Sequence, residues 1–277
     1  MKLVRFTLLD EPTARSGFFY EEKIYETDGV QPIGIHKLHE VRLLSPIPRH
    51  PNFRDFMSFE EHLINVRKKF GREDVPKEWY AAPSFFYQNA TSIVGPNEPI
   101  PQPAFTRELD FELEVGIVIG ENGSNIPVEE ADDYILGFTI INDWTARDVQ
   151  RREIRVGIGF GKSKDFATSV GPYLVTPDEL ESKCRDTERG KVYELTMRAY
   201  VNNELITEGN LKNMHWTFAE MVSYASQGVE LQTGDLIGSG TVGKGCILEH
   251  ERDYLKPGDE VILQVEGLGE LRNPIIE

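Results

Sequence analysis

Three carboxylates at alternate positions, Asp110, Glu112 and Glu114, are the residues that most directly suggest chemistry. Side chains two residues apart on a β-strand point to the same side, so the segment LDFELEVGIVIG predicts apolar residues on one face and these acids on the other. Like charges held this close disfavour ionisation unless a cation compensates them. Oxygen ligands of this kind suit Mg²⁺, Mn²⁺ or Ca²⁺. A solvated strand face is the competing interpretation.

Two further residues could take part in such a site. Asp143 ends the apolar run YILGFTIIND, and a polar group at the end of a buried strand is a common position for a binding site. The alternative is that Asp143 caps the start of a helix. His62 lies on the apolar face of an expected helix, where a lone histidine is more often structural than catalytic. The remaining histidines have no spacing typical of metal ligands.

The elements that must position these residues are mainly strands. Short strand patterns fill the first 45 residues, and several more follow residue 108. One helix is predicted to begin at a capping box of Ser58 and Glu61 and to end near Gly71, and another covers 215–228. Strands and helices do not alternate regularly, which favours a β-rich α+β fold over a doubly wound parallel sheet. The proline-rich segment SPIPRHPN predicts a junction between a small N-terminal β domain, 1–48, and a catalytic domain, 49–277.

Charge excludes several classes of partner. The chain of 277 residues has 46 acidic and 30 basic residues, a formal net charge of −16. Such a protein repels nucleic-acid backbones and anionic membrane surfaces. Its two cysteines do not form a disulfide framework. Neither a secretory signal nor an apolar run of membrane-spanning length is found, so we expect a reduced cytoplasmic protein.

Taken together, separated segments of the chain resemble the fumarylacetoacetate hydrolase family, in the manner of a short, bacterial-type member. The resemblance covers roughly residues 50–250 and follows the order of the family's motifs. The matching segments are RDFMSFEEH, LDFELEVGIVIG, INDWTARDVQ, GKSKDFATSVGP, GSGTVG and CILEH. It implies the family's β-rich catalytic domain, a mixed β-sheet roll, with a small N-terminal domain.

The resemblance also implies a role for each residue that matches a motif. The implied metal ligands are Asp55, Glu112, Glu114 and Asp143, with Asp110 in a supporting position. The implied catalytic residues are His62, Glu249 and Lys162, and the substrate contacts are Arg147, Gln150 and Thr241. Lys164 remains an alternative to Lys162, because the lysine segment has both. Phe86 falls where the fumarylacetoacetate enzyme has a substrate-contacting tyrosine, which weakens any expectation of the same substrate.

These roles predict a metal-dependent hydrolase that cleaves a C–C bond in a β-diketo acid, such as an acylpyruvate or a fumarylacetoacetate-like compound. Mg²⁺, or Mn²⁺ or Ca²⁺, would stabilise the departing enolate. His62 would act as general base, since an ordinary imidazole pKa of about 6.5 suits proton transfer near neutrality. Alternatives are an isomerase or decarboxylase of a related dicarboxylate at the same site, or a non-catalytic metal-binding or ligand-binding domain. A homodimer that acts in aromatic catabolism is also expected from the resemblance.

Overall fold

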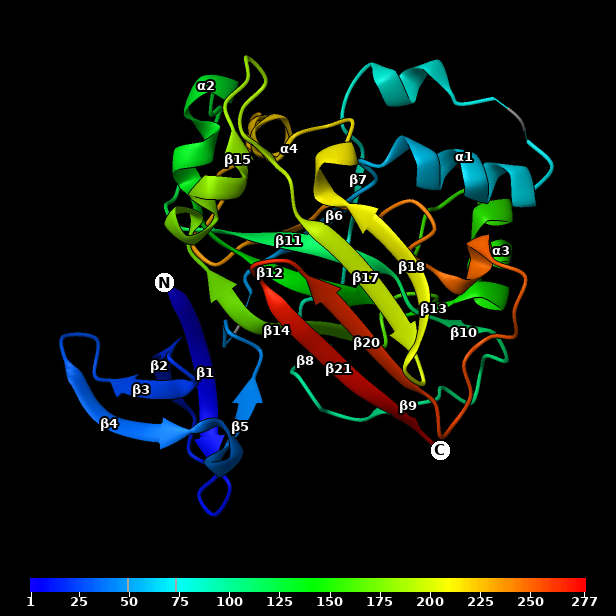
Figure 1. Cartoon of the computed structure of the whole chain (residues 1–277). Coiled ribbons are helices and arrows are strands. Elements are labelled where there is room, and N and C mark those ends of the chain that lie inside the picture. Colours follow the sequence, from blue (N-terminus) through cyan, green and yellow to red (C-terminus); the bar gives the residue numbers. More distant parts are fainter. Residues whose placement is uncertain (49, 73) are drawn as a thin grey trace.

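The computed structural model describes residues 1–48, 50–72 and 74–277. Within these residues the strands form two main sheets, one of 12 strands and one of five, accompanied by short helices (Figure 1). The predicted β-rich α+β fold is confirmed. None of the helices in the described residues is long and apolar enough to cross a membrane.

The larger sheet has the strand order β4-β3-β2-β1-β14-β12-β11-β19-β6-β7, with β5 beside β1 and β8 beside β14. Its strands are β1 (Lys2–Leu8), β2 (Arg15–Tyr20), β3 (Lys23–Thr27), β4 (Pro32–Lys37), β5 (Val41–Leu44), β6 (Phe53–Phe56), β7 (Phe85–Tyr87), β8 (Ile93–Val94), β11 (Leu113–Ile119), β12 (Ile135–Asp143), β14 (Thr168–Val175) and β19 (Leu236–Gly238). Most neighbours are antiparallel, but β19 runs parallel to β6.

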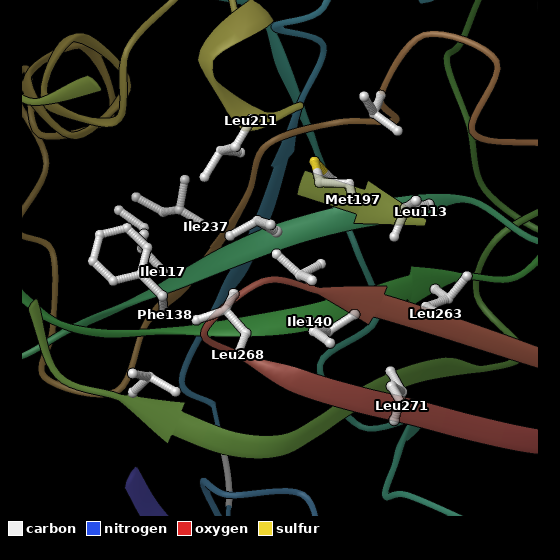
Figure 2. Close-up of a cluster of buried hydrophobic side chains, with 14 of the residues drawn as sticks. Leu113, Ile117, Phe138, Ile140, Met197, Leu211, Ile237, Leu263, Leu268 and Leu271 are labelled. Atoms are coloured by element: carbon white, nitrogen blue, oxygen red, sulfur yellow. The ribbon is translucent and has the colours of Figure 1, made fainter. Parts of the chain in front are cut away.

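The smaller sheet packs across β11, β12 and β14 of the larger one. It has the order β18-β17-β20-β21-β9, from β9 (Ile100–Pro101), β17 (Thr196–Val201), β18 (Glu204–Asn210), β20 (Glu260–Val265) and β21 (Gly269–Ile276). Figure 2 shows the apolar layer between the sheets, to which Ile117 and Ile140 of the larger sheet and Leu263 of the smaller one all contribute. Burial of these side chains stabilises both sheets by removing apolar surface from water.

The N-terminal strands continue the larger sheet. Strand β1 pairs with β14, so that Lys2 lies opposite Val175 and Leu3 opposite Leu174. The stacked rings of Phe19 and Tyr173 add an aromatic contact between the two segments. The predicted junction at 48 and 49 falls on residue 49, which lies outside the described residues, and the division into two domains stays a prediction.

Four α-helices of the described residues lie at the ends of the sheets: α1 (Glu60–Lys69), α2 (Val128–Ala131), α3 (Arg147–Val156) and α4 (Phe218–Ala225). Both predicted helices are present, but the predicted capping box at α1 is wrong. Phe59 is the N-cap residue of α1, and the Ser58 hydroxyl donates instead to the Ser239 carbonyl oxygen, 181 residues away. A capping box does form at α4, between Thr217 and Glu220.

The strand predicted across residues 109–120 is interrupted. Short strand β10 (Leu109–Asp110) pairs with β13 (Thr145–Ala146), and β11 begins at Leu113. The Asn142 side chain accepts a hydrogen bond from the Glu112 N–H, and the Gly245 carbonyl accepts from the Leu113 N–H. This break includes Phe111 and Glu112, and it separates Asp110 from Glu114. A further two-stranded pair joins β15 (Cys184–Arg185) to β16 (Val192–Tyr193), and both cysteines are free thiols.

Candidate functional site

Four adjacent strands of the larger sheet bring together residues that are distant in the sequence. Strands β12, β11, β19 and β6 lie side by side and provide Asp143, Glu114, Gly238 and Asp55. All three carboxylates are buried, so the solvated strand face considered from the sequence is wrong for Glu114. Asp143 does not cap a helix either, because α3 begins four residues later, after Ala146.

A glycine in the middle strand lets two of the carboxylates approach each other. Gly238 lies opposite Asp55 in the parallel β6–β19 pair. A Cβ atom at Gly238 would lie 2.4 Å from Asp55 Oδ1 and 3.1 Å from Glu114 Oε2. Only a residue without a side chain therefore leaves room for both oxygens. Sequence reasoning missed Gly238, although it is the first residue of the GSGTVG motif.

The carboxylates of Asp55, Glu114 and Asp143 form a cluster that suits a cation. Each offers an oxygen, and these oxygens lie within 4.8 Å of one another. Asp55 Oδ1 and Glu114 Oε2 are buried and have no hydrogen-bond partner among the described residues. Oxygen donors that are hard, anionic and unpaired fit Mg²⁺, Mn²⁺ or Ca²⁺. We call these three residues the carboxylate cluster.

The electrostatics of the carboxylate cluster also favour a cation. Burial raises the pKa of Asp55 to about 6, although attraction to the Lys164 ammonium opposes the shift. Burial, followed by repulsion from Asp55 and Asp143, holds the pKa of Glu114 well above its usual range. Burial also raises the pKa of Asp143, with Lys164 opposing it. A bound cation would favour the ionised form of all three acids.

Lys164, and not Lys162, lies at the carboxylate cluster. Its ammonium donates to Glu112 Oε2 at 2.6 Å, to Thr145 Oγ1 at 2.9 Å and to Asp143, and its side chain is only 3% exposed. Burial opposes this charge, but Asp143 and Glu112 outweigh burial and raise the lysine pKa. Lys162 is 55% exposed and pairs with Asp165. The placement expected for Lys162 is therefore corrected to Lys164, the alternative left open by the sequence.

Glu112 and Arg147 form a second layer beside the carboxylate cluster. Arg147 is buried, and its guanidinium donates to Asp110 at 2.7 Å and to Gln150 at 3.0 Å and lies 2.8 Å from Glu112. Burial would raise the pKa of Glu112, but Lys164, Arg147 and then His62 together lower it below its usual range. Arg147 and Gln150, expected to face substrate, contact each other here. Whether they or Glu112 also bind a ligand stays a prediction.

His62 and Glu249 form the pair that the sequence predicted. Glu249 Oε2 lies 2.9 Å from His62 Nδ1. A carboxylate only accepts, so Nδ1 carries the proton and Nε2 is free to act as a base. Burial alone would raise the pKa of Glu249, but attraction to His62 and hydrogen bonds from His62, Asn65 and the Lys244 N–H lower it.

Asp110 holds the turn that contains Glu249. Its carboxylate accepts from the N–H groups of Ile247 and Leu248, at 2.7 and 3.0 Å, in the 3₁₀ turn Ile247–Glu249. The same carboxylate accepts from Arg147. Asp110 therefore links the turn that holds Glu249 to the Arg147 guanidinium, which in turn contacts Glu112. The supporting role expected for Asp110 agrees with these contacts.

Other side chains complete the surroundings of the cluster. Thr241 is buried and donates to Glu114 Oε1 at 3.3 Å. The ammonium of Lys164 lies 5.7 Å from the centre of the Phe86 ring and 5.8 Å from that of Phe160. These rings meet edge to face at 5.1 Å.

Gln88 is a site residue that sequence reasoning missed. It is buried, and its amide donates to Asp143 Oδ1 at 2.5 Å. No sequence motif marks Gln88. It directly follows β7, in which Phe86 pairs with Asp55 across β6 and β7, so its position at the cluster depends on strand register.

Comparison with known proteins assigns the family. A family model described as fumarylacetoacetate (FAA) hydrolase C-terminal matches residues 52–276. The chain therefore belongs to the fumarylacetoacetate hydrolase family. Its fold agrees with this, since it superposes over its whole length on 99% of fumarylacetoacetate hydrolase from psychrophilic Exiguobacterium antarcticum, with a TM-score of 0.79 and 28% identity.

The curated relatives include proteins with the name oxaloacetate tautomerase. The mitochondrial protein of Xenopus laevis is 34% identical over 202 residues, which are 73% of this chain and 59% of that protein. YisK of Bacillus subtilis is 32% identical over 248 residues, which are 87% of this chain and 75% of that protein. The chain thus spans about three fifths of the Xenopus relative.

Proposed function

We propose that this protein is a divalent-cation-dependent enzyme that cleaves a C–C bond in a β-diketo acid by hydrolysis. The observation that carries the proposal is the pairing of His62 with Glu249 close to a buried carboxylate cluster and the Lys164 ammonium. A base, an orienting acid and a cation site are the groups that such a reaction needs. Their grouping also argues against a domain that only binds a ligand.

Asp55, Glu114 and Asp143 would hold the cation, with Glu112 beside them. When bound, a divalent cation supplies positive charge that stabilises an enolate oxygen. His62 Nε2 would take a proton from water while Glu249 stabilises the imidazolium. The water oxygen would then bond to a carbonyl carbon, and the electrons of the broken C–C bond would move to the departing carbon. The imidazolium would return its proton to that carbon.

Lys164 would contribute a second positive charge. Its ammonium is held by Glu112, Asp143 and Thr145, so it is oriented before substrate binds. A fixed cation in a buried site stabilises developing negative charge without the reorganisation that water requires. The expected substrate is a small diketo or dicarboxylic acid. The expected homodimer is proposed from the family resemblance.

Enol–keto tautomerisation of a 2-oxo dicarboxylate is the second candidate. The names of the relatives at 32–34% identity favour it. The same base would remove a proton and return it to another atom, without adding water. Hydrolysis remains our first proposal because a base with its own orienting carboxylate is suited to activating water.

A panel of acylpyruvates, related diketo acids and oxaloacetate tests the proposal. Chromatography scores cleavage and loss of CO₂, and NMR in D₂O scores proton exchange without cleavage. Cleavage into two acids supports hydrolysis, whereas exchange alone would assign tautomerisation.

His62→Ala should then abolish turnover while cation binding survives, and His39→Ala, at an exposed histidine, serves as the control. Unchanged turnover in His62→Ala would refute the proposed base. Cation binding by a wild-type protein that turns over none of the acids would favour a binding domain.

A further inference from the structure

The carboxylate of Glu249 accepts more hydrogen bonds than its contact with His62 alone would provide. Among the described residues, four donors reach its two oxygens. Oε2 accepts from His62 Nδ1 at 2.9 Å and from Cys246 Sγ at 3.3 Å, while Oε1 accepts from Asn65 Nδ2 and the Lys244 N–H, both at 2.9 Å. The Glu249 side chain is fully buried. These hydrogen bonds offset the cost of burying its charge.

Helix α1 supplies two of these four donors. His62 and Asn65 are three residues apart, so their side chains lie on the same face of the helix. They reach different oxygens of one carboxylate, which fixes the carboxylate plane relative to the helix that holds the base. Without Asn65, the group could rotate about its terminal torsion, which is a soft one.

We propose that Asn65 is a positioning residue for His62, acting through Glu249, and that Cys246 assists it. The catalytic consequence rests on the proposed function, while the structural consequence does not. An asparagine suits this position because its amide donates a hydrogen bond and has no charge of its own. A carboxylate at position 65 would repel Glu249. An alkyl side chain there would leave Oε1 with the Lys244 N–H as its one remaining donor among the described residues.

The thiol of Cys246 is the weaker partner. It is buried, and burial raises its pKa well above the usual range, so the group stays a neutral donor. A thiol is a weak donor. Cys246 lies three residues before Glu249, at the start of the same 3₁₀ turn, and therefore limits movement of the oxygen that faces His62.

The test is a double-mutant cycle with Asn65→Leu and Glu249→Ala. Asn65→Leu keeps the size of the side chain and removes the donor, and kcat should fall about tenfold, the typical effect of losing a hydrogen bond to a charged group. KM and cation affinity should stay at wild-type values. In the Glu249→Ala background, Asn65→Leu should cause no further loss. Ile64→Ala, on the same helix, is the control for helix disturbance.

Cys246→Ala gives an independent arm if Asn65→Leu folds poorly, with an expected fall in kcat of about threefold. Wild-type kcat in both variants would overturn the proposal. So would an equal loss from Asn65→Leu with and without Glu249, because an effect that does not depend on Glu249 cannot act through it.

A spectroscopic readout separates this inference from the proposed reaction. The Nδ1 proton of His62, assigned by comparison with His62→Ala, should give a protected downfield NMR signal in the wild-type protein. In Asn65→Leu that signal should shift and exchange faster with water. If the wild type turns over none of the acids but this change is seen, the proposed function fails and the positioning role stands. An unchanged signal refutes the positioning role.

Discussion

Removing the charge of Lys164 should be more damaging than removing that of its neighbour Lys162. Lys164→Met keeps much of the side-chain length but deletes an ammonium that contacts Glu112, Asp143 and Thr145. The two carboxylates then remain buried without their partner. Breaking a buried ion pair from one side costs about 3–5 kcal/mol.

The size of the effect follows from burial. Lys164 is 3% exposed, so solvent does little to compensate the lost charge. In the chelated protein, Lys164→Met should lower the melting temperature by about 10 °C. Turnover should fall about a hundredfold, the usual loss when one group that stabilises developing negative charge is removed.

Lys162→Met is the matched control. Lys162 is 55% exposed, and Asp165, its partner, is 41% exposed. An exposed pair of this kind contributes less than about 1 kcal/mol, so this variant should melt and react like the wild type. Scanning calorimetry with chelator or with Mg²⁺, followed by turnover assays, measures both quantities.

Added Mg²⁺ should stabilise Lys164→Met more than it stabilises the wild type, because the cation replaces part of the missing positive charge. The reasoning would be refuted if Lys164→Met melted and reacted normally, or if Lys162→Met caused the larger loss.

Three more predictions concern the carboxylate cluster. Exhaustive chelation should abolish turnover, and Mg²⁺ or Mn²⁺ should restore it; full activity in a verified metal-free sample would rule out the cation's role. Since burial raises the pKa of Asp55 from 3.8 to about 6, its contribution to stability is full below pH 3.8 and is lost as the pH rises through 6. In metal-free protein this loss should be about 3 kcal/mol, and urea unfolding of Asp55→Asn should show a flatter pH dependence; the same slope in both proteins would disprove the assignment. Gly238→Ala should weaken Mg²⁺ binding about tenfold in calorimetry, because the new methyl group displaces Asp55, and wild-type affinity would contradict the close approach.

The sequence was sufficient for the candidate site where each residue lies within a distinctive motif. The pairing of His62 with Glu249 and the proximity of Asp55, Glu114 and Asp143 were implied by the resemblance of their motifs to those of the family. Alternation predicted that Glu112 and Glu114 share a face. It could not predict that this face is buried, because burial depends on strands and loops far away in the chain.

The errors have similar long-range causes. Ser58 matches a capping box locally, but the carbonyl of Ser239 competes for its hydroxyl. The choice between Lys162 and Lys164 depends on the path of the chain after α3, where Gly157 and Gly159 both have positive φ angles. Glycines make that path depend on tertiary packing rather than on local preference. Gln88 lies in none of the recognised motifs, and only strand register brings its amide to Asp143.

The position of β19 between β6 and β11 has a consequence for how the protein is synthesised. Asp55, Glu114 and Asp143 all leave the ribosome before residues 236–238, yet β6 joins β11 only through that later strand. A nascent chain that ends before β19 therefore has every acid of the carboxylate cluster but lacks the strand that aligns them. Pairing across about 180 residues is also slow, because a long loop must close first. The proposed cation site is thus complete only after β19 has paired with both β6 and β11, late in the synthesis and folding of the chain.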